Sequence, residues 1–153
     1  MSRHLFLFTI GPVQSFIAQA RKTQDLYSGS RILSDLIDEA INTLDKSGII
    51  DSNDLIFPNR KIQSKPNRLL AILKTDDPGK IGNDVEDAVR RRFKASAEKA
   101  LKKNSIRELP ELRSHIENFL KIYWVALPCN GNYSEKYEEI ERLLGAVKNV
   151  RVV

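Results

Sequence analysis

Residues 4–12 have the sequence HLFLFTIGP. The first seven form a short run of strand-favouring residues, and Gly11-Pro12 predicts the turn that ends it. Pro12 stands where a helix can begin, because its missing N–H would have no helical partner there. After it the apolar residues take helical spacing, on a face made of Val13, Phe16, Ile17 and Ala20. The chain therefore opens with a strand, a tight turn and a helix.

A second helical stretch follows a break at residues 27–30 (YSGS), where Ser28 or Ser30 would cap it. Gly48 ends this helix. Six apolar residues recur at helical spacing and predict its buried face. They are Leu33, Leu36, Ile37, Ala40, Ile41 and Leu44.

The rest of the chain alternates between strands and helices. Strands are predicted at 54–57 and 68–74, on either side of a polar, basic hairpin loop. A turn at 76–79 precedes a long helix with Val85, Ala88, Val89, Phe93, Ala97 and Ala100 facing inward. The remaining elements are a helical piece at about 109–119, a strand at 120–129 and a helix at 133–147 with Tyr137, Ile140, Leu143 and Leu144 on one side.

The order β-α-β-β-α-β plus a C-terminal helix predicts an α+β fold of the ferredoxin-like kind. In that fold two helices cover one face of an antiparallel sheet, so its strands should alternate between apolar and polar residues. Here LFLF, LLAIL and IYWVAL are apolar at nearly every position. Either the added helices cover the second face or another domain lies against it.

Length and composition agree with a single domain over residues 1–153. The net charge of +5 permits an anionic partner without requiring one. One cysteine, Cys129, excludes a disulfide framework and indicates a buried structural thiol. The short apolar N-terminal run is neither a membrane span nor a secretory signal, so we expect a cytoplasmic protein with no membrane partner.

Few residues suggest catalysis. His4 and His115 have no partner at metal-ligand spacing, and Asp76-Asp77 precedes Pro78-Gly79, which favours a turn over a magnesium site. The turn at Gly11 is a better candidate, because a strand that ends in a glycine turn and opens a helix directs free N–H groups at an anion.

Two clusters of basic residues could follow a phosphate backbone or form a solvated face. The predicted basic surface consists of Arg60, Lys61, Lys65 and Arg68 in one cluster and Arg90, Arg91 and Arg92 in the other.

Residues 10–36, IGPVQSFIAQARKTQDLYSGSRILSDL, resemble the start of the first palm domain in the large subunit of type III-B (Cmr-type) CRISPR effector complexes. The family pattern is G-P-V-Q-x-F-I-x-x-A-R-K-T-x-D-L-W-x-G-S, followed by L-S-x-L. This chain departs from it at Tyr27, where Trp is usual, and at Gln24, where a basic residue is common. The similarity is specific over some 25 residues and covers a small part of the chain.

The resemblance implies a subunit with two palm, cyclase-like domains. Such a subunit makes cyclic oligoadenylate from ATP in antiviral defence, with Mg²⁺ as the cofactor. ATP lies between the palms, and the metal-binding Gly-Gly-Asp-Asp hairpin belongs to the second. This chain would then be one domain of a longer subunit. Its partners would be the second palm, other subunits of the complex and, indirectly, CRISPR RNA and target RNA.

By the same resemblance, nucleotide contacts fall on the first turn and the broken helix. The residues are Gly11, Pro12, Val13, Gln14, Ser15, Ser30 and Ser34. An active palm also needs carboxylates at the end of its first strand and on its hairpin. Here those positions, 9–11 and 59–67, are neutral or basic, so we expect no catalytic residue, no metal ligand and no activity of this domain alone.

Two alternatives remain open. The first is an RNA-binding module that stacks bases on Phe6 and Phe8 of its first strand. The second is a structural bridge that binds neighbouring subunits through residues 60–68 or 90–103.

Overall fold

The computed structural model describes residues 2–11, 26–51, 53–62, 65–103, 118–129 and 133–151. Their elements are β1 (Arg3–Gly11), α2 (Leu26–Lys46), β2 (Leu55–Phe57), β3 (Arg68–Lys74), α3 (Pro78–Lys103), β4 (Lys121–Pro128) and α5 (Tyr133–Arg151). The predicted strands and the three long helices are confirmed. The first predicted helix and most of the piece at 109–119 lie outside the described residues.

The predicted break at residues 27–30 is wrong, because α2 runs without interruption from Leu26. Ser and Gly have modest helix propensities, but the cost is small beside the burial of the apolar face that follows. All six residues predicted for that face are buried. Gly48 has φ of 69° directly after α2, which is the left-handed conformation that glycine adopts at helix ends.

The four strands form one sheet in the order β2-β3-β1-β4, and every neighbouring pair is antiparallel. β1 and β2 are therefore parallel to each other with β3 between them. Likewise β3 and β4 are parallel with β1 between them. Phe6 of β1 stands opposite Ala71 on one side and Ala126 on the other. The chain is thus an α+β domain in which helices connect strands that are not neighbours.

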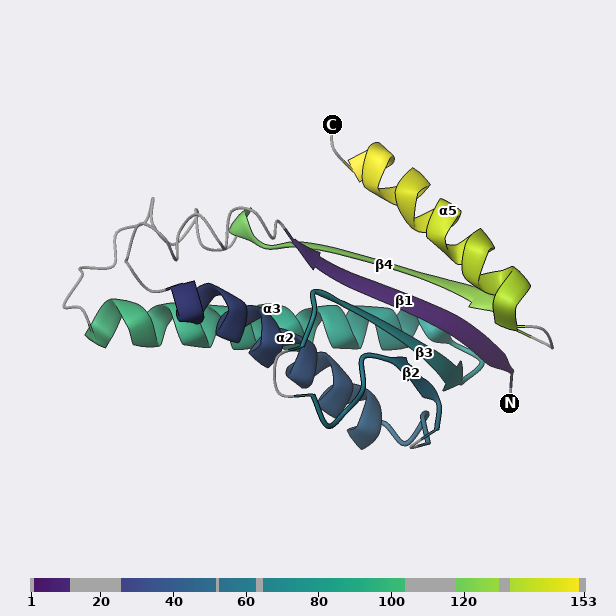
Figure 1. The fold of residues 1–153 in the computed structure, drawn as a ribbon, viewed down its shortest axis with the longest axis horizontal. Helices are drawn as coiled ribbons and strands as arrows, with labels where there is room; N and C mark the ends of the chain where they lie inside the picture. Colours follow the sequence, from purple (N-terminus) through teal and green to yellow (C-terminus); the bar gives the residue numbers. More distant parts are fainter. Residues whose placement is uncertain are drawn as a thin grey trace.

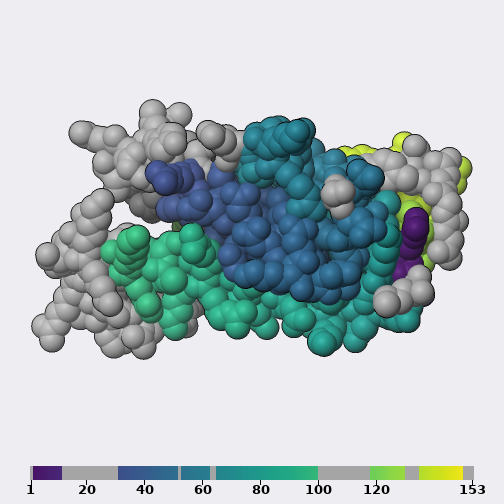
Figure 2. Space-filling view, turned by 90° about the horizontal axis from the view of Figure 1, so that it is seen from below, coloured from purple at the N-terminus to yellow at the C-terminus, as the bar shows by residue number. Residues whose placement is uncertain are grey.

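Both faces of the sheet are covered, which explains why the strands do not alternate between apolar and polar residues. Phe6, Phe8 and Ile10 point toward α2 and α3, whereas Leu5 and Leu7 point toward α5. Figure 1 shows the layers, with α5 on one side of the sheet and the two other long helices on the opposite side. Figure 2 shows α2 and α3 side by side over their face. The added C-terminal helix therefore covers the second face.

α5 packs through a narrow stripe. Of the four residues predicted on one side of this helix, Ile140 and Leu144 are buried, whereas Tyr137 and Leu143 are 39% and 36% exposed. One helix on a sheet face buries only the residues that point directly at the strands. None of the described helices is long and apolar enough to cross a membrane.

Candidate functional site

The end of β1 is tied to the connection between β2 and β3. Ile10 N–H donates to the carbonyl of Asn67 (2.9 Å), and the Asn67 side-chain amide donates to the carbonyl of Ile10 (3.0 Å). Gly11, the last residue of β1, is half-buried and pairs with Lys121 of β4. The β2–β3 connection therefore lies beside the point where the chain leaves the sheet toward residue 12.

Ser34 ties α2 to the same connection. Its hydroxyl accepts a hydrogen bond from Lys65 N–H (2.9 Å) and donates one to the Lys65 carbonyl (3.3 Å). The side chain is buried, with 6% exposure. A nucleotide contact of Ser34 stays a prediction, and the described hydrogen bonds give its hydroxyl a structural role.

Lys65 is not part of the surface, contrary to the prediction from its cluster. It is 8% exposed, and its ammonium lies 3.3 Å from Asp38 Oδ1 of α2. The same ammonium donates to the carbonyls of Arg60 (3.3 Å) and Ile62. A buried lysine needs oxygen partners for its charge, and here the loop folds around the ammonium to supply them.

The other predicted nucleotide contacts are only partly described. Pro12, Val13, Gln14 and Ser15 lie outside the described residues. Ser30 lies in the early turns of α2, and its side chain is outside the described part. These assignments stay predictions.

Three of the predicted basic residues are engaged in structural contacts. Arg60 forms a bidentate salt bridge with Asp45 of α2, with N–O distances of 2.7 and 3.0 Å. Arg68 pairs with Glu141 of α5 (3.0 Å). Arg90 pairs with Glu86 and donates to the carbonyl that precedes β4.

The exposed cations of the predicted surface are Lys61, Arg91 and Arg92. Lys61 belongs to the β2–β3 connection, and the two arginines belong to α3. The basic surface is therefore two separate patches, each smaller than the sequence clusters indicate.

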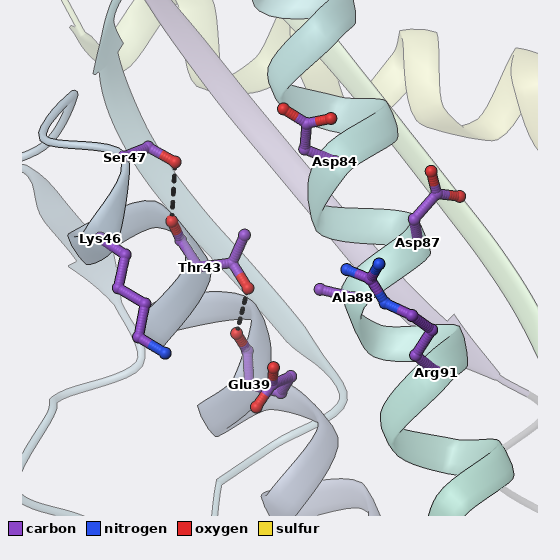
Figure 3. A pocket seen from close by; sticks show the side chains of 8 residues that line it. All are labelled: Glu39, Thr43, Lys46, Ser47, Asp84, Asp87, Ala88 and Arg91. Atoms are coloured by element: carbon purple, nitrogen blue, oxygen red, sulfur yellow. Dashed lines mark hydrogen bonds between the residues drawn. The ribbon is translucent and has the colours of Figure 1, made fainter.

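Arg91 lines a groove of about 400 Å³ between α2 and α3. Figure 3 shows the two helices as its walls, with Glu39 and Thr43 on one side and Asp84 and Asp87 on the other. Three carboxylates against two cations make the groove a poor match for a polyanion. Sequence analysis missed it, since these residues meet only once the two helices lie side by side.

The described residues around the end of β1 carry little net charge. Asn67, Ser34 and Gly11 are neutral, and the ammonium of Lys65 is paired with the carboxylate of Asp38. Mg²⁺ prefers carboxylate oxygens, and that of Asp38 is engaged by Lys65. Among the described residues no group of three His, Cys, Asp or Glu could hold a metal ion.

Asp76 and Asp77 serve the turn, as predicted. Asp77 Oδ1 accepts from Lys80 N–H (3.1 Å) and so caps α3, whose first residue is Pro78. Asp76 Oδ1 accepts from Ser2 N–H (2.8 Å), and this hydrogen bond lowers the pKa of the Asp76 carboxyl. Cys129 is a buried free thiol, also as predicted.

Base stacking on β1 is ruled out. Phe6 and Phe8 have no exposed surface and lie in the core beneath α2 and α3. A module that stacks bases on its sheet needs those aromatic rings on an open face. The alternative of an RNA-binding module that stacks bases on Phe6 and Phe8 therefore lacks the exposed aromatic rings that it needs.

A comparison with protein-family models gives a match that covers the first part of the chain. The model described as "CRISPR-associated protein Cmr2, N-terminal" matches residues 5–64. This span runs from β1 through α2 and β2 into the β2–β3 connection, and it contains Ser34. The match supports a relation to the N-terminal region of Cmr2 in type III-B CRISPR complexes. No curated protein matches the chain.

Proposed function

We propose that this chain is a catalytically degenerate palm domain of a type III-B CRISPR large subunit, which acts in the cytoplasm. It supplies part of an ATP site to a second, active palm that holds Mg²⁺ and makes cyclic oligoadenylate. The observation that carries the proposal is the family match over residues 5–64. That segment contains all the residues predicted to contact the nucleotide, from Gly11 to Ser34, and it ends at Ser64, before Lys65 and Asn67.

The topology supports the palm assignment. A ferredoxin-like palm is a split β-α-β arrangement, in which each helix connects parallel strands separated by a third. The strand order β2-β3-β1-β4 with all neighbours antiparallel has this property. The palm would use the end of β1 and the β2–β3 connection as its nucleotide side.

The chemistry of that side supports a binding role without catalysis. In place of carboxylates, the described end of β1 and the β2–β3 connection carry Gly11, Asn67 and Lys65, and the charge of Lys65 is paired with Asp38 of α2. The phosphate oxygens would be bound by backbone N–H groups of the predicted turn after Gly11. Phosphoryl chemistry would then depend on the metal ions of the second palm.

An ATP–Mg²⁺ titration followed by amide NMR tests the proposal. The amide signals of residues 11–15 and 30–34 should shift with ATP and stay unchanged with sulfate at equal ionic strength. Gly11→Asp places a carboxylate at the phosphate position and should abolish the shifts, because like charges repel. Gly145→Asp on the exposed face of α5 is the matched control and should leave them intact.

The titration is repeated with the second palm domain added. Shifts that appear only then would mean that the site needs both palms, which the proposal allows. An absence of shifts with the second palm present would contradict it and would favour a subunit bridge through exposed Lys61, Arg91 and Arg92.

A further inference from the structure

β4 is an edge strand with little protection against pairing. It runs from Lys121 to Pro128, KIYWVALP, and among the described strands it pairs only with β1. Edge strands are usually guarded by charges, prolines, bulges or short length. In β4 the charge, Lys121, and the proline, Pro128, stand at its two ends, and the six residues between them are uncharged. The opposite edge, β2, has three residues and an irregular register.

The hydrogen bonds show which groups of β4 point outward. Cys129 N–H donates to the Arg3 carbonyl (2.9 Å). Bonded and non-bonded pairs alternate along an antiparallel ladder, so the odd-numbered residues of β4 bond to β1. The even-numbered residues direct their N–H and C=O groups away from β1. Pro128, which has no N–H, falls on an outward position, as this alternation requires.

Trp124 and Ala126 therefore present two N–H and two C=O groups to the open edge. Within the described ranges, neither residue makes a backbone hydrogen bond on that side. Their side chains are fixed by the core, because both pack against the cluster beneath α2 and α3. The four groups form a rigid template for one more extended strand.

The apolar surface of α5 extends toward the same edge. Glu141 lies on the flank of α5 that faces β3, since it pairs with Arg68. Two residues farther along the helix, Leu143 points about 160° away from Glu141, at 100° per residue. Leu143 thus lies on the flank toward the β4 edge, and it is 36% exposed.

We propose that β4 pairs antiparallel with β4 of a second copy of this chain, about a two-fold axis through Val125. Trp124 of each copy then stands opposite Ala126 of the other, and the four outward groups of each copy pair to give four hydrogen bonds across the interface. In this register Lys121 stands opposite Cys129 of the second copy, so the two lysines do not face each other. A second copy fits this edge because no like charges meet in the register and because each copy also brings an exposed Leu143 to the same face.

The same symmetry brings the two α5 helices together on one face. Strands lie about 4.8 Å apart, and α5 packs against both β1 and β4, so its axis lies about half a strand spacing inside β4. The two helices are then two strand spacings apart, about 10 Å, which is a packing distance for helices. Leu143 of each copy faces the neighbouring helix and loses its exposed surface.

Sedimentation velocity over a range of concentrations tests the pairing in the full chain, with Ala126→Pro as the main variant and Ala126→Ser as its control. Proline removes the outward N–H and leaves the ladder to β1 untouched, whereas serine keeps the N–H. Two hydrogen bonds are lost per dimer, each worth about a fivefold change in the equilibrium constant. We expect the dimer dissociation constant to rise roughly thirty-fold in A126P and to change little in A126S.

Leu143→Glu provides a second test that leaves the strand intact. It should also weaken the dimer, because two carboxylates meet where two apolar side chains should pack. Amide exchange gives a third readout, since the Trp124 and Ala126 N–H groups should become protected as the concentration rises. A chain that stays monomeric at millimolar concentration, or a folded A126P variant that dimerises as the wild type does, would overturn the proposal.

Discussion

Gly82 of α3 lies against the indole ring of Trp124 of β4. A Cβ on Gly82 would stand 2.6 Å from three ring atoms, closer than real Cβ atoms approach. One turn along α3, Glu86 Oε1 accepts a hydrogen bond from Trp124 Nε1 (3.2 Å). The glycine therefore sets how closely α3 approaches the sheet, and the glutamate fixes the orientation of the ring.

Gly82→Ala should destabilise the fold although alanine is the better helix former. The methyl group must displace a packed indole, which typically costs about 1–3 kcal/mol, against a gain in helix propensity of about 1 kcal/mol. Urea denaturation measures the net change. Gly145→Ala in α5 is the matched control, because a Cβ there meets nothing within 4 Å. It should stabilise by about 1 kcal/mol. Equal effects of the two variants would contradict the close packing at Gly82.

Ser34→Ala should lower the free energy of unfolding by about 1–3 kcal/mol, because it leaves the buried Lys65 N–H without its acceptor. Ser47→Ala is the control, since the Ser47 hydroxyl donates to Thr43 O at an exposed site and its loss should cost under about 0.5 kcal/mol. Urea denaturation compares the two. If S34A and S47A were equally stable, the hydrogen bonds of Ser34 would not be what holds α2 to the β2–β3 connection. In that case a loss of ATP binding in S34A without a loss of stability would indicate a direct contact between Ser34 and the nucleotide.

The ion pair between Asp51 and Lys74 should make stability depend on acid pH. The hydrogen bond and charge of Lys74 hold the pKa of the Asp51 carboxyl below its ordinary value of 3.8. A carboxyl with a depressed pKa in the folded state stabilises the fold above its unfolded pKa, and the effect is lost as pH falls through the folded value. Asp51→Asn should therefore lower Tm at pH 6 and approach the wild-type Tm near pH 2. Thermal melts from pH 6 to pH 2 measure this, and parallel curves would contradict it.

Glu141 should control the ionisation of Tyr137, one turn earlier in α5. A hydrogen bond and the negative charge of Glu141 raise the pKa of the Tyr137 phenol above its ordinary value of 10.0. Glu141→Gln removes the charge, so the Tyr137 pKa should fall toward that value. NMR titration of the tyrosine ring signals at alkaline pH measures the change. Glu139→Gln, which disrupts only the surface pair with Lys136, should leave the Tyr137 pKa where it is.

Much of the fold could be predicted from local sequence patterns. The apolar face of α2, the left-handed Gly48 after it and the Asp77 cap of α3 all follow from periodicity and turn chemistry within a few residues. The start of α2 did not follow, because Tyr27-Ser28-Gly29-Ser30 resembles a break. Burial of the apolar face farther along the helix outweighs that local preference.

The nucleotide contacts inferred from the family pattern stay predictions. The structure places Gly11 at the end of β1 and Ser34 on α2, where its hydroxyl bonds to Lys65 of the β2–β3 connection. The role of Lys65 was not predictable, because a lysine in a basic loop ordinarily stays in water. Its burial depends on oxygens from Asp38 and from two carbonyls of its own loop, which only the folded loop brings together.

The order of strands and helices, the buried face of α2 and the neutral and basic character of residues 59–67 can be read from the sequence alone. The folded structure adds which sheet faces are covered, which basic side chains form ion pairs and, among the described strands, which strands stand at the edges of the sheet. Secondary structure follows from interactions within a few residues of chain. Burial and ion pairing bring together residues that are far apart in the sequence, such as Arg68 and Glu141, so they depend on the complete tertiary structure.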